Sequence, residues 1–216
     1  MSMVDRNRRD WFGAPPMAAP RAILFDMDGV LVRSEEIWFR VVEEAGRRFR
    51  GSPVTREEFA PTFGQGTRAD IEVFGLSCTP EELDRFYLEY FRRNVDAIWV
   101  NPDAAPLLET LRARGIRVGV VTNTVTDLAE EILRVAKLRH LVDALSCADM
   151  VSNPKPAPDL VLHGLAALDV SADEAWVVGD SRFDREAARA AGVWFVGFGI
   201  DGDARVDALS ALPALL

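Results

Sequence analysis

The sequence contains few residues of the kinds that bind soft metals or form disulfide bridges. Among its 216 residues are two cysteines, Cys78 and Cys147, and two histidines, His140 and His163. The cysteines are far apart and lack metal-like spacing, so we expect reduced thiols and a cytoplasmic location. Both histidines fall in or beside helix-like segments, which argues against a histidine-based metal site or catalytic triad.

Long apolar runs and an excess of positive charge are absent as well. No apolar stretch approaches the roughly 20 residues that cross a bilayer, and the amino terminus lacks the apolar segment of a secretory signal. The 34 acidic residues outnumber the 25 basic residues, which gives a net charge of -9. A field of that sign repels nucleic acid and anionic membranes, so we predict neither as a partner. An anionic small-molecule substrate would need cations placed locally.

What the sequence does have is an apolar fraction of 49%, which is ample for a core. Residues 1–20 mix arginine, alanine and proline without a sustained period, and this predicts a flexible leader. Residues 34–100 show helical spacing throughout, with a capping-box pattern that begins at Thr55 and a helix start at Thr79. We therefore predict that residues 34–100 are wholly helical.

Continuous apolar strands alternate with helices in the rest of the chain. The predicted strands are residues 22–25, 118–121, 144–148, 175–178 and 193–198. This pattern predicts an α/β fold with a doubly wound parallel sheet, a Rossmann-like core built from residues 21–33 and 101–216. The helical segment is far longer than an ordinary crossover. It is therefore predicted to be an inserted cap domain above the carboxyl ends of the strands, where ligands bind in such sheets.

Two carboxylates directly follow the first strand. Residues 22–29 read Ala-Ile-Leu-Phe-Asp-Met-Asp-Gly. Side chains at positions i and i+2 of extended backbone point to the same side, so Asp26 and Asp28 can converge. Like charges held close together favour a divalent cation as a third partner. The alternative is an ordinary Asp-Gly turn with both acids in solvent.

Polar residues also follow three later strands. Thr122 and Asn123 follow the second, where a hydroxyl can donate to a substrate oxygen or simply cap a helix. Lys155 lies in a proline-rich loop after the third strand, as a rigidly placed cation or a solvated surface lysine. Asp180 and Asp184 follow the fourth, as ligands or as acids that favour a helix N-terminus. Such residues at the ends of four strands are an implausible coincidence, so we expect one site.

Together these residues resemble the signatures of the haloacid dehalogenase superfamily, on the branch with a helical cap. The likeness lies in Asp-Met-Asp-Gly-Val-Leu-Val at 26–32, Val-Thr-Asn at 121–123, Lys-Pro-Ala-Pro-Asp at 155–159, and Gly-Asp at 179–180 through Asp184 and Ala-Gly at 191–192. All occur in the family's order. The likeness extends to phosphoglycolate phosphatase and β-phosphoglucomutase relatives, without a signature that selects one of them.

The resemblance implies a phosphatase that hydrolyses a small phosphate ester. Asp26 would be the nucleophile that forms an aspartyl-phosphate, and Asp28 the general acid and base. Thr122 and Lys155 would hold the transferring oxygens, and Asn123 would contact the substrate.

The resemblance also implies Mg²⁺ as the cofactor. Its ligands would be Asp26, the backbone carbonyl of Asp28, Asp180 and, directly or through water, Asp184; hard oxygen ligands of this kind suit the ion. We expect a monomer, with a dimer as the alternative.

Substrate specificity is expected to lie in the cap. The stretch at 63–68 contains Gly64, Gln65 and Arg68, which would form a substrate-binding loop with Arg68 available to a second anionic group. The alternative is a turn between helices with a solvated arginine. Arg33 departs from the aspartate that many relatives have at its position.

Three other functions compete with a phosphatase. A phosphomutase uses the same nucleophile and differs mainly in whether the cap keeps water from the intermediate. A dehalogenase needs no leaving-group acid, so the presence of Asp28 favours phosphoryl transfer. A phosphoester-binding module without turnover is disfavoured, because every expected catalytic position is filled.

Overall fold

The computed structural model describes residues 19–63, 65–95 and 98–216. The predicted leader therefore lies outside the described residues except for Ala19 and Pro20, and so does Gly64 of the predicted substrate loop. Among the described helices, none combines the length and the apolarity that a membrane crossing requires.

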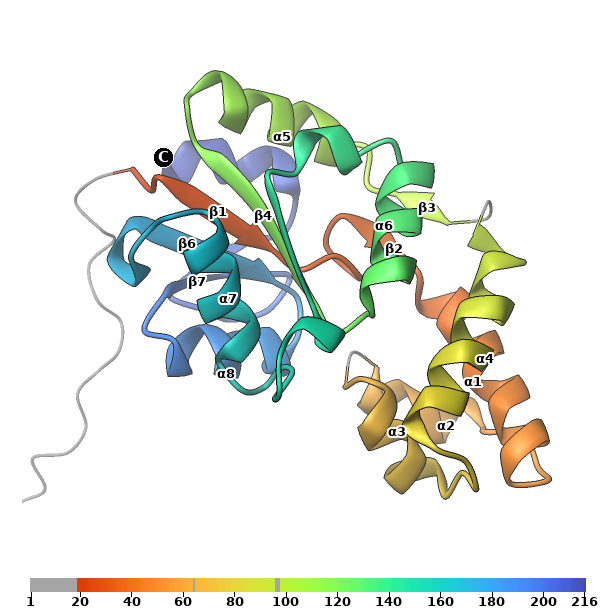
Figure 1. The fold of residues 1–216 in the computed structure, drawn as a ribbon. Helices are drawn as coiled ribbons and strands as arrows, with labels where there is room; N and C mark the ends of the chain where they lie inside the picture. The colour runs from red at the N-terminus through yellow and green to blue at the C-terminus, as the bar shows by residue number, and fades with distance from the viewer. Residues whose placement is uncertain (1–18, 64, 96–97) are drawn as a thin grey trace, which may run out of the picture.

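A six-stranded parallel sheet forms the centre of the fold (Figure 1). Its strands, in spatial order, are β5 (Ala144–Cys147), β4 (Arg117–Thr122), β1 (Ala22–Phe25), β6 (Ala175–Gly179), β7 (Trp194–Phe198) and β8 (Ala204–Val206). Strand β1 lies in the middle, where Phe25 pairs with Val120 on one side and Val178 on the other. Its four residues are fully buried, as expected of a strand that is covered on both faces.

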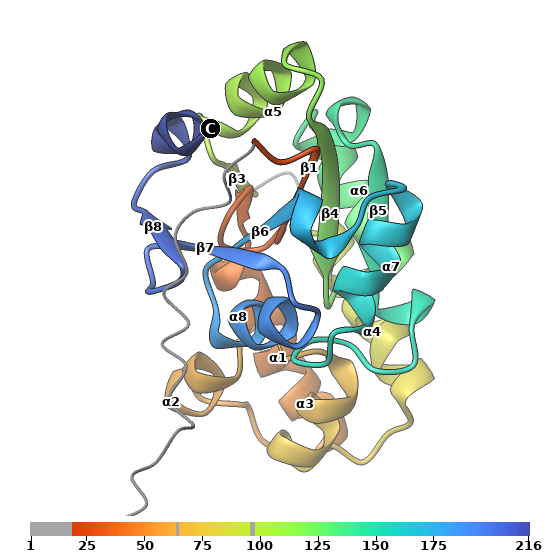
Figure 2. The ribbon, with the colours of Figure 1, turned by 90° about the vertical axis from the view of Figure 1, so that its left-hand side faces the viewer.

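Helices cover both faces of this sheet (Figure 2). The helices are α5 (Ala104–Ala113), α6 (Thr126–Val135), α7 (Asp159–Ala167) and α8 (Arg182–Ala190). Alternate residues of β1 enter different clusters: Ile23 and Phe25 pack in the cluster that holds residues of α5 and α6, and Leu24 in the cluster that holds residues of α7 and α8. The predicted doubly wound α/β core is therefore confirmed. Short 3₁₀ turns occur at Ala60–Thr62, Arg139–Leu141, Ala148–Met150, Ala172–Glu174 and Leu209–Leu215.

Strand β8 was missed in the sequence. It has three residues, of which only Val206 is buried, and a strand so short shows neither an apolar run nor a clear alternation. It pairs with β7 in parallel, with Phe198 opposite Val206.

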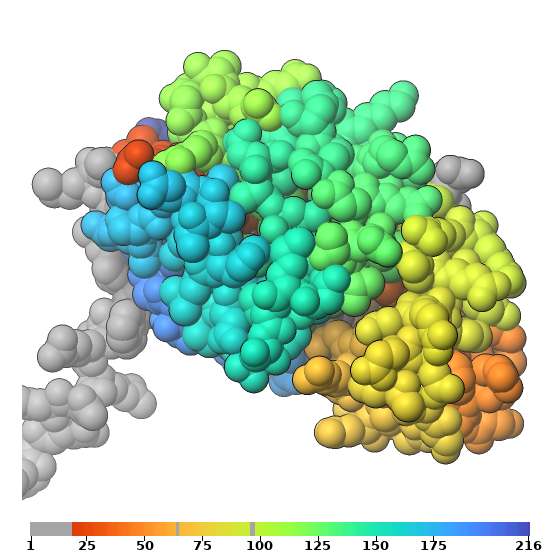
Figure 3. Space-filling model, viewed as in Figure 1, coloured from red at the N-terminus to blue at the C-terminus, as the bar shows by residue number. Residues whose placement is uncertain are grey.

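Four of the described α-helices, all between residues 35 and 92, lie beyond the carboxyl end of the sheet, and Figure 3 shows them as a lobe against the rest of the molecule. These cap helices are α1 (Glu35–Phe49), α2 (Arg56–Phe59), α3 (Thr67–Phe74) and α4 (Pro80–Arg92). Thr55 and Thr79 form the capping boxes of α2 and α4, as their spacing predicts. Helix α1 packs on α4, where the ring centroids of Trp38 and Phe91 are 4.9 Å apart.

The prediction of helix as far as Val100 was wrong at its end. Trp99–Val100 is a strand, β3, which pairs antiparallel with β2 (Val32–Arg33). The Arg33 guanidinium carbon lies 4.2 Å from the ring centroid of its cross-strand partner Trp99. The chain therefore enters and leaves the cap helices through one two-stranded ribbon, whose strands are too short for a period-2 pattern to reveal.

Candidate active site

Lys155 joins the carboxyl ends of three strands or their following loops. Its ammonium donates to Oδ1 of Asp26 at 2.6 Å, to Oδ1 of Asp184 at 2.6 Å and to the Val121 carbonyl at 3.1 Å. These three acceptors match its three N–H donors, and the side chain is only 4% exposed. The alternative that Lys155 is a solvated surface lysine is therefore wrong.

Asp184 both caps a helix and faces the site. Its Oδ2 accepts from the backbone N–H of Ser181 at 3.0 Å and its own N–H donates to the Ser181 hydroxyl at 3.3 Å, which together form the capping box of α8. The Ser181 hydroxyl also donates to Oδ2 at 2.5 Å. Oδ1 of Asp184 accepts from Lys155. Asp184 therefore caps α8 and contacts Lys155 at the same time, and its role as a metal ligand stays a prediction.

Asp180 reaches the same place because Gly29 leaves room for it. A Cβ at position 29 would lie 1.9 Å from Oδ2 of Asp180, and Gly29 has a φ of +98°. Asp26, Asp180 and Asp184 each offer a carboxylate oxygen within 4.8 Å of the others. Such a group of hard oxygen donors has the chemistry that Mg²⁺ prefers.

The Asp28 side chain lies outside this group of three and is held by two hydroxyls. The Ser34 hydroxyl donates to its Oδ1, and the Thr124 hydroxyl donates to its Oδ2 at 3.1 Å. Neither hydroxyl belongs to the site that the sequence predicts. A signal existed for Thr124, because it lies two positions after Thr122 at the end of β4.

Burial and mutual repulsion shift the titration of these groups. Burial, together with the charge of Asp184, raises the pKa of Asp26 well above its ordinary value and that of Asp180 to about 7. Burial also raises the pKa of Asp28, against the opposing hydrogen bonds from Ser34 and Thr124. Burial by itself would lower the pKa of Lys155, but the charges of Asp184 and Asp26 outweigh it and the pKa is raised.

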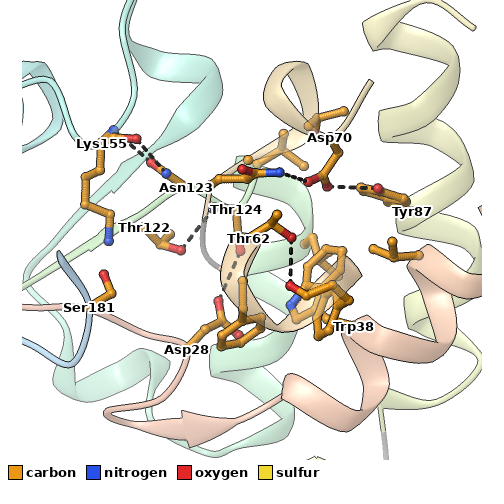
Figure 4. Close-up of a pocket in the computed structure, with 18 of the residues that line it drawn as sticks. Asp28, Trp38, Thr62, Asp70, Tyr87, Thr122, Asn123, Thr124, Lys155 and Ser181 are labelled. Atoms are coloured by element: carbon orange, nitrogen blue, oxygen red, sulfur yellow. Dashed lines mark hydrogen bonds between the residues drawn. The ribbon is translucent and has the colours of Figure 1, made fainter. Parts of the chain in front are cut away.

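Thr122 and Asn123 line the same cavity from the end of β4 (Figure 4). The Thr122 hydroxyl accepts from the backbone N–H of Thr124 at 3.1 Å. The Asn123 amide forms two hydrogen bonds with the backbone of Lys155, accepting from its N–H at 2.9 Å and donating to its carbonyl at 3.0 Å. Asn123 therefore fixes the loop that carries the lysine.

The cavity, of about 270 Å³, lies between these strand ends and the cap helices. Gln65 lines it, as expected of the predicted substrate loop, whereas Arg68 is exposed and is not among the lining residues. The sequence did not single out Asp70 and Tyr87, which line its cap side. Asp70 lies four positions before the buried Phe74 in α3, so an acid on an apolar helix face was the available signal.

Comparisons with known proteins agree with this geometry. Residues 23–198 match the family described as haloacid dehalogenase-like hydrolase. The phosphoglycolate phosphatase (plasmid) of Cupriavidus necator is 34% identical over 216 aligned positions, and the alignment covers 90% of this chain and 92% of that protein. The phosphorylated carbohydrates phosphatase of Thermotoga maritima is 30% identical over 182 residues, spanning 80% of this chain and 82% of that protein.

A solved structure has a similar overall fold. The crystal structure of CbbY from Rhodobacter sphaeroides in complex with xylulose-(1,5)bisphosphate superposes with a TM-score of 0.81, at 26% identity, over 89% of this chain and 96% of that chain. The family match covers both the parallel core and the inserted helices. The chain therefore belongs to the haloacid dehalogenase-like hydrolases, as one of the phosphatases of that family.

Proposed function

We propose that the protein is a Mg²⁺-dependent phosphatase that hydrolyses a small phosphorylated metabolite through an aspartyl-phosphate on Asp26. The observation that carries this proposal is the meeting of Asp26, Asp180, Asp184 and Lys155 at the edge of one cavity. The phosphatase names of two curated relatives support the reaction class.

The charge of the site fits a divalent cation. Four carboxylates gather around one ammonium group, and the raised pKa values of Asp26 and Asp180 express the cost of keeping them ionised together. Asp26, Asp180 and Asp184 would hold the ion. When bound, Mg²⁺ supplies positive charge that favours the ionised carboxylates and offsets the charge of the phosphoryl group.

The first half of the reaction uses Asp26 and Asp28. A carboxylate oxygen of Asp26 attacks phosphorus, and the bond to the leaving oxygen breaks. Asp28 gives its proton to that oxygen, so the alcohol leaves neutral. The raised pKa of Asp28 supports this role, since it favours the protonated carboxyl that the step requires.

The second half returns the enzyme to its starting state. Water attacks the phosphorus of the aspartyl-phosphate, Asp28 accepts the proton, and the bond to Asp26 breaks. Inorganic phosphate and the carboxylate of Asp26 result. Throughout, Lys155 keeps the Asp26 carboxylate in place through the 2.6 Å contact with its Oδ1, so much of the catalysis is positioning and charge neutralisation.

Replacement of the nucleophile tests this proposal. Asp26→Asn should lower turnover of p-nitrophenyl phosphate by about 10⁴-fold or more, the order found when a member of a covalent catalytic unit is removed. The fold should remain, because Lys155 keeps its contacts with Asp184 and the Val121 carbonyl. Asp173→Asn, at an exposed position, is the charge-matched control and should keep its activity. Full activity in Asp26→Asn refutes the assignment.

The same chemistry leaves phosphomutase activity as the second candidate. β-Glucose 1-phosphate with a bisphosphate primer should release inorganic phosphate from this enzyme, whereas clean isomerisation would make it a mutase. Dehalogenation is disfavoured by Asp28, and a haloacetate control checks this.

A monomeric state and a cytoplasmic location stay predictions. The predicted location is supported by the free thiols of Cys78 and Cys147.

A further inference from the structure

The two sides of the cavity carry opposite chemistry toward an anion. The strand ends present Lys155 and the proposed metal ligands, which suit a phosphoryl group. On the cap side, the charged residues that line the cavity within the described ranges are two acids, Asp70 and Asp84. No lysine, arginine or histidine of the described cap helices lines it.

Asp70 is a buried hydrogen-bond acceptor and not a surface acid. It is 9% exposed, and its oxygens accept from the Gln65 amide at 2.8 Å and from the Tyr87 hydroxyl at 2.9 Å (Figure 4). Burial raises its pKa to about 6, so it is largely ionised at pH 7.5. Asp84, one turn before Tyr87 on α4, accepts from the Thr67 hydroxyl at 2.7 Å.

The arginines of the cap region have other positions. Arg68 is exposed and is not among the lining residues. Arg56 lies over the Phe39 ring and pairs with Glu36, and Arg33 lies over Trp99. An anionic end of a substrate in this cavity would therefore meet the carboxylates of Asp70 and Asp84, and among the described residues no cation of the cap lines the cavity beside them. Arg68, whose charge acts on Asp84, lies outside the lining.

The remaining cap-side lining includes apolar surface. Trp38 lines the cavity with its ring 5.5 Å from that of Tyr87, and Phe59 and Phe63 line it with centroids 5.7 Å apart. Such rings suit the carbon skeleton of a small molecule, and the carboxylates suit its hydrogen-bond donors.

Resting on the proposed phosphatase function, we propose that the leaving group of the substrate carries no negative charge and donates hydrogen bonds to Asp70 and Asp84. Hydroxyl groups of a polyol or sugar, or an ammonium group, have this chemistry. A carboxylate or a second phosphate does not. The preferred substrate class thus differs from the phosphoglycolate and the bisphosphate in the names of two relatives.

Two pairs of closely similar esters test the proposal through kcat/KM at pH 7.5. Glycerol 3-phosphate and 3-phosphoglycerate differ in a hydroxymethyl against a carboxylate, and phosphoethanolamine and phosphoglycolate differ in an ammonium against a carboxylate. In each pair the member without the carboxylate should have a kcat/KM at least about tenfold higher. The repulsion between two like charges in close contact exceeds the free energy that corresponds to a tenfold change. The first pair tests a hydroxyl group as the hydrogen-bond donor of the leaving group, and the second pair tests an ammonium group.

Matched variants connect this preference to the cap acids. Asp70→Asn and Asp84→Asn should each reduce the preference severalfold, chiefly by improving kcat/KM for the carboxylate member of each pair. Glu72→Gln removes the same charge from an exposed position of α3 and should leave the ratios unchanged. Circular dichroism confirms that each variant is folded.

The experiment distinguishes a failure of this substrate proposal from a failure of the proposed phosphatase function. Preference for 3-phosphoglycerate or phosphoglycolate overturns the proposal, and its loss in Arg68→Gln would assign the anion site to Arg68. Absence of turnover on p-nitrophenyl phosphate overturns the phosphatase instead. In that case, dissociation constants of the same esters on the Asp26→Asn protein decide the proposal without turnover: tighter binding of the members without a carboxylate supports it, and tighter binding of the carboxylates refutes it.

Discussion

At the residue scale, the carboxyl of Asp70 is placed where ionisation is costly. Its pKa is raised from 3.8 to about 6, chiefly by burial, against the hydrogen bonds from Gln65 and Tyr87. The folded protein therefore holds this proton more tightly than the unfolded chain does. Stability is unaffected by Asp70 below about pH 4, falls as the pH rises through the window from 4 to 6, and stays lower above it.

Asp70→Asn should therefore stabilise the protein at neutral pH. We expect a free energy of unfolding higher by about 1 to 3 kcal/mol at pH 7.5, since the shift of about two pKa units sets the upper end. The gain should vanish near pH 4. Urea denaturation at several pH values measures it, and a gain of equal size at pH 4 and 7.5 would contradict the titration as its cause.

Gly29 governs the site through the space that it leaves. The Cβ of Gly29→Ala would lie only 1.9 Å from Oδ2 of Asp180, so the Asp180 carboxylate would have to move. We expect an apparent Mg²⁺ affinity lower by about 10- to 100-fold, as for other losses of ligand support. The measurement is the Mg²⁺ dependence of p-nitrophenyl phosphate hydrolysis.

Gly115→Ala separates crowding from backbone strain. Gly115 also has a positive φ, +75°, but a Cβ there meets nothing within 4 Å. It should lose stability without a change in Mg²⁺ dependence. Equal metal dependence in both variants would show that the contact with Asp180 is irrelevant.

At the element scale, two helix starts with similar sequences have different tasks. The Thr79 side chain caps α4 by accepting from the N–H of Glu82 at 3.2 Å. Ser34 occupies the same position of α1, yet its hydroxyl donates to Asp28 and makes no cap hydrogen bond. The first turn of α1 is thus tied to Asp28, and that of α4 only to its own helix.

Alanine at each position should reveal this difference. Ser34→Ala removes a hydrogen bond that lowers the pKa of Asp28, so that pKa should rise and the limb of the pH–rate profile that reports Asp28 should move to higher pH. Thr79→Ala should cost about 1 kcal/mol of stability and leave the profile in place. A displaced profile in Thr79→Ala, or an unchanged one in Ser34→Ala, would contradict the assignment.

Sequence patterns predicted the elements whose burial is encoded locally. Strand β1 is covered on both faces, and its run of Ala22–Phe25 is apolar without interruption. The short β2, β3 and β8 carry no such signal because their few residues depend on the strands beside them. The acids at the strand ends were selected for another reason: parallel strands bring their carboxyl ends to one edge.

The cap side of the cavity was far less predictable. Asp70 and Tyr87 meet through the packing of α3 on α4, and nothing in either segment alone shows that their side chains touch. The predicted Arg68 lies on the same helix as Asp70 but is exposed. The predicted loop therefore indicated the correct region, since Gln65 lines the cavity and Arg68 does not.

At the scale of the whole molecule, metal binding and stability should be linked. A cation that binds only the folded site stabilises it by about 2.7 kcal/mol at a hundredfold excess over its dissociation constant. We expect Mg²⁺ to raise the Tm of the wild-type protein and exhaustive chelation to abolish activity.

Asp180→Asn should show a much smaller rise in Tm with Mg²⁺, because it weakens a proposed ligand. Asp173→Asn, at an exposed position outside the group, should behave as wild type. Differential scanning calorimetry with and without Mg²⁺ makes the comparison. Activity that survives chelation, or an equal rise in Asp180→Asn, would count against the metal proposal.

The ribbon of β2 and β3 makes the group of cap helices a modular part of the molecule. Arg33 and Trp99 face one another, so the excursion between them begins and ends at a single point of the core. A different insertion could be spliced at that point without rerouting any strand of the sheet. A change of substrate could then come from exchange of the segment between β2 and β3, while the reacting groups of the parallel core keep their positions.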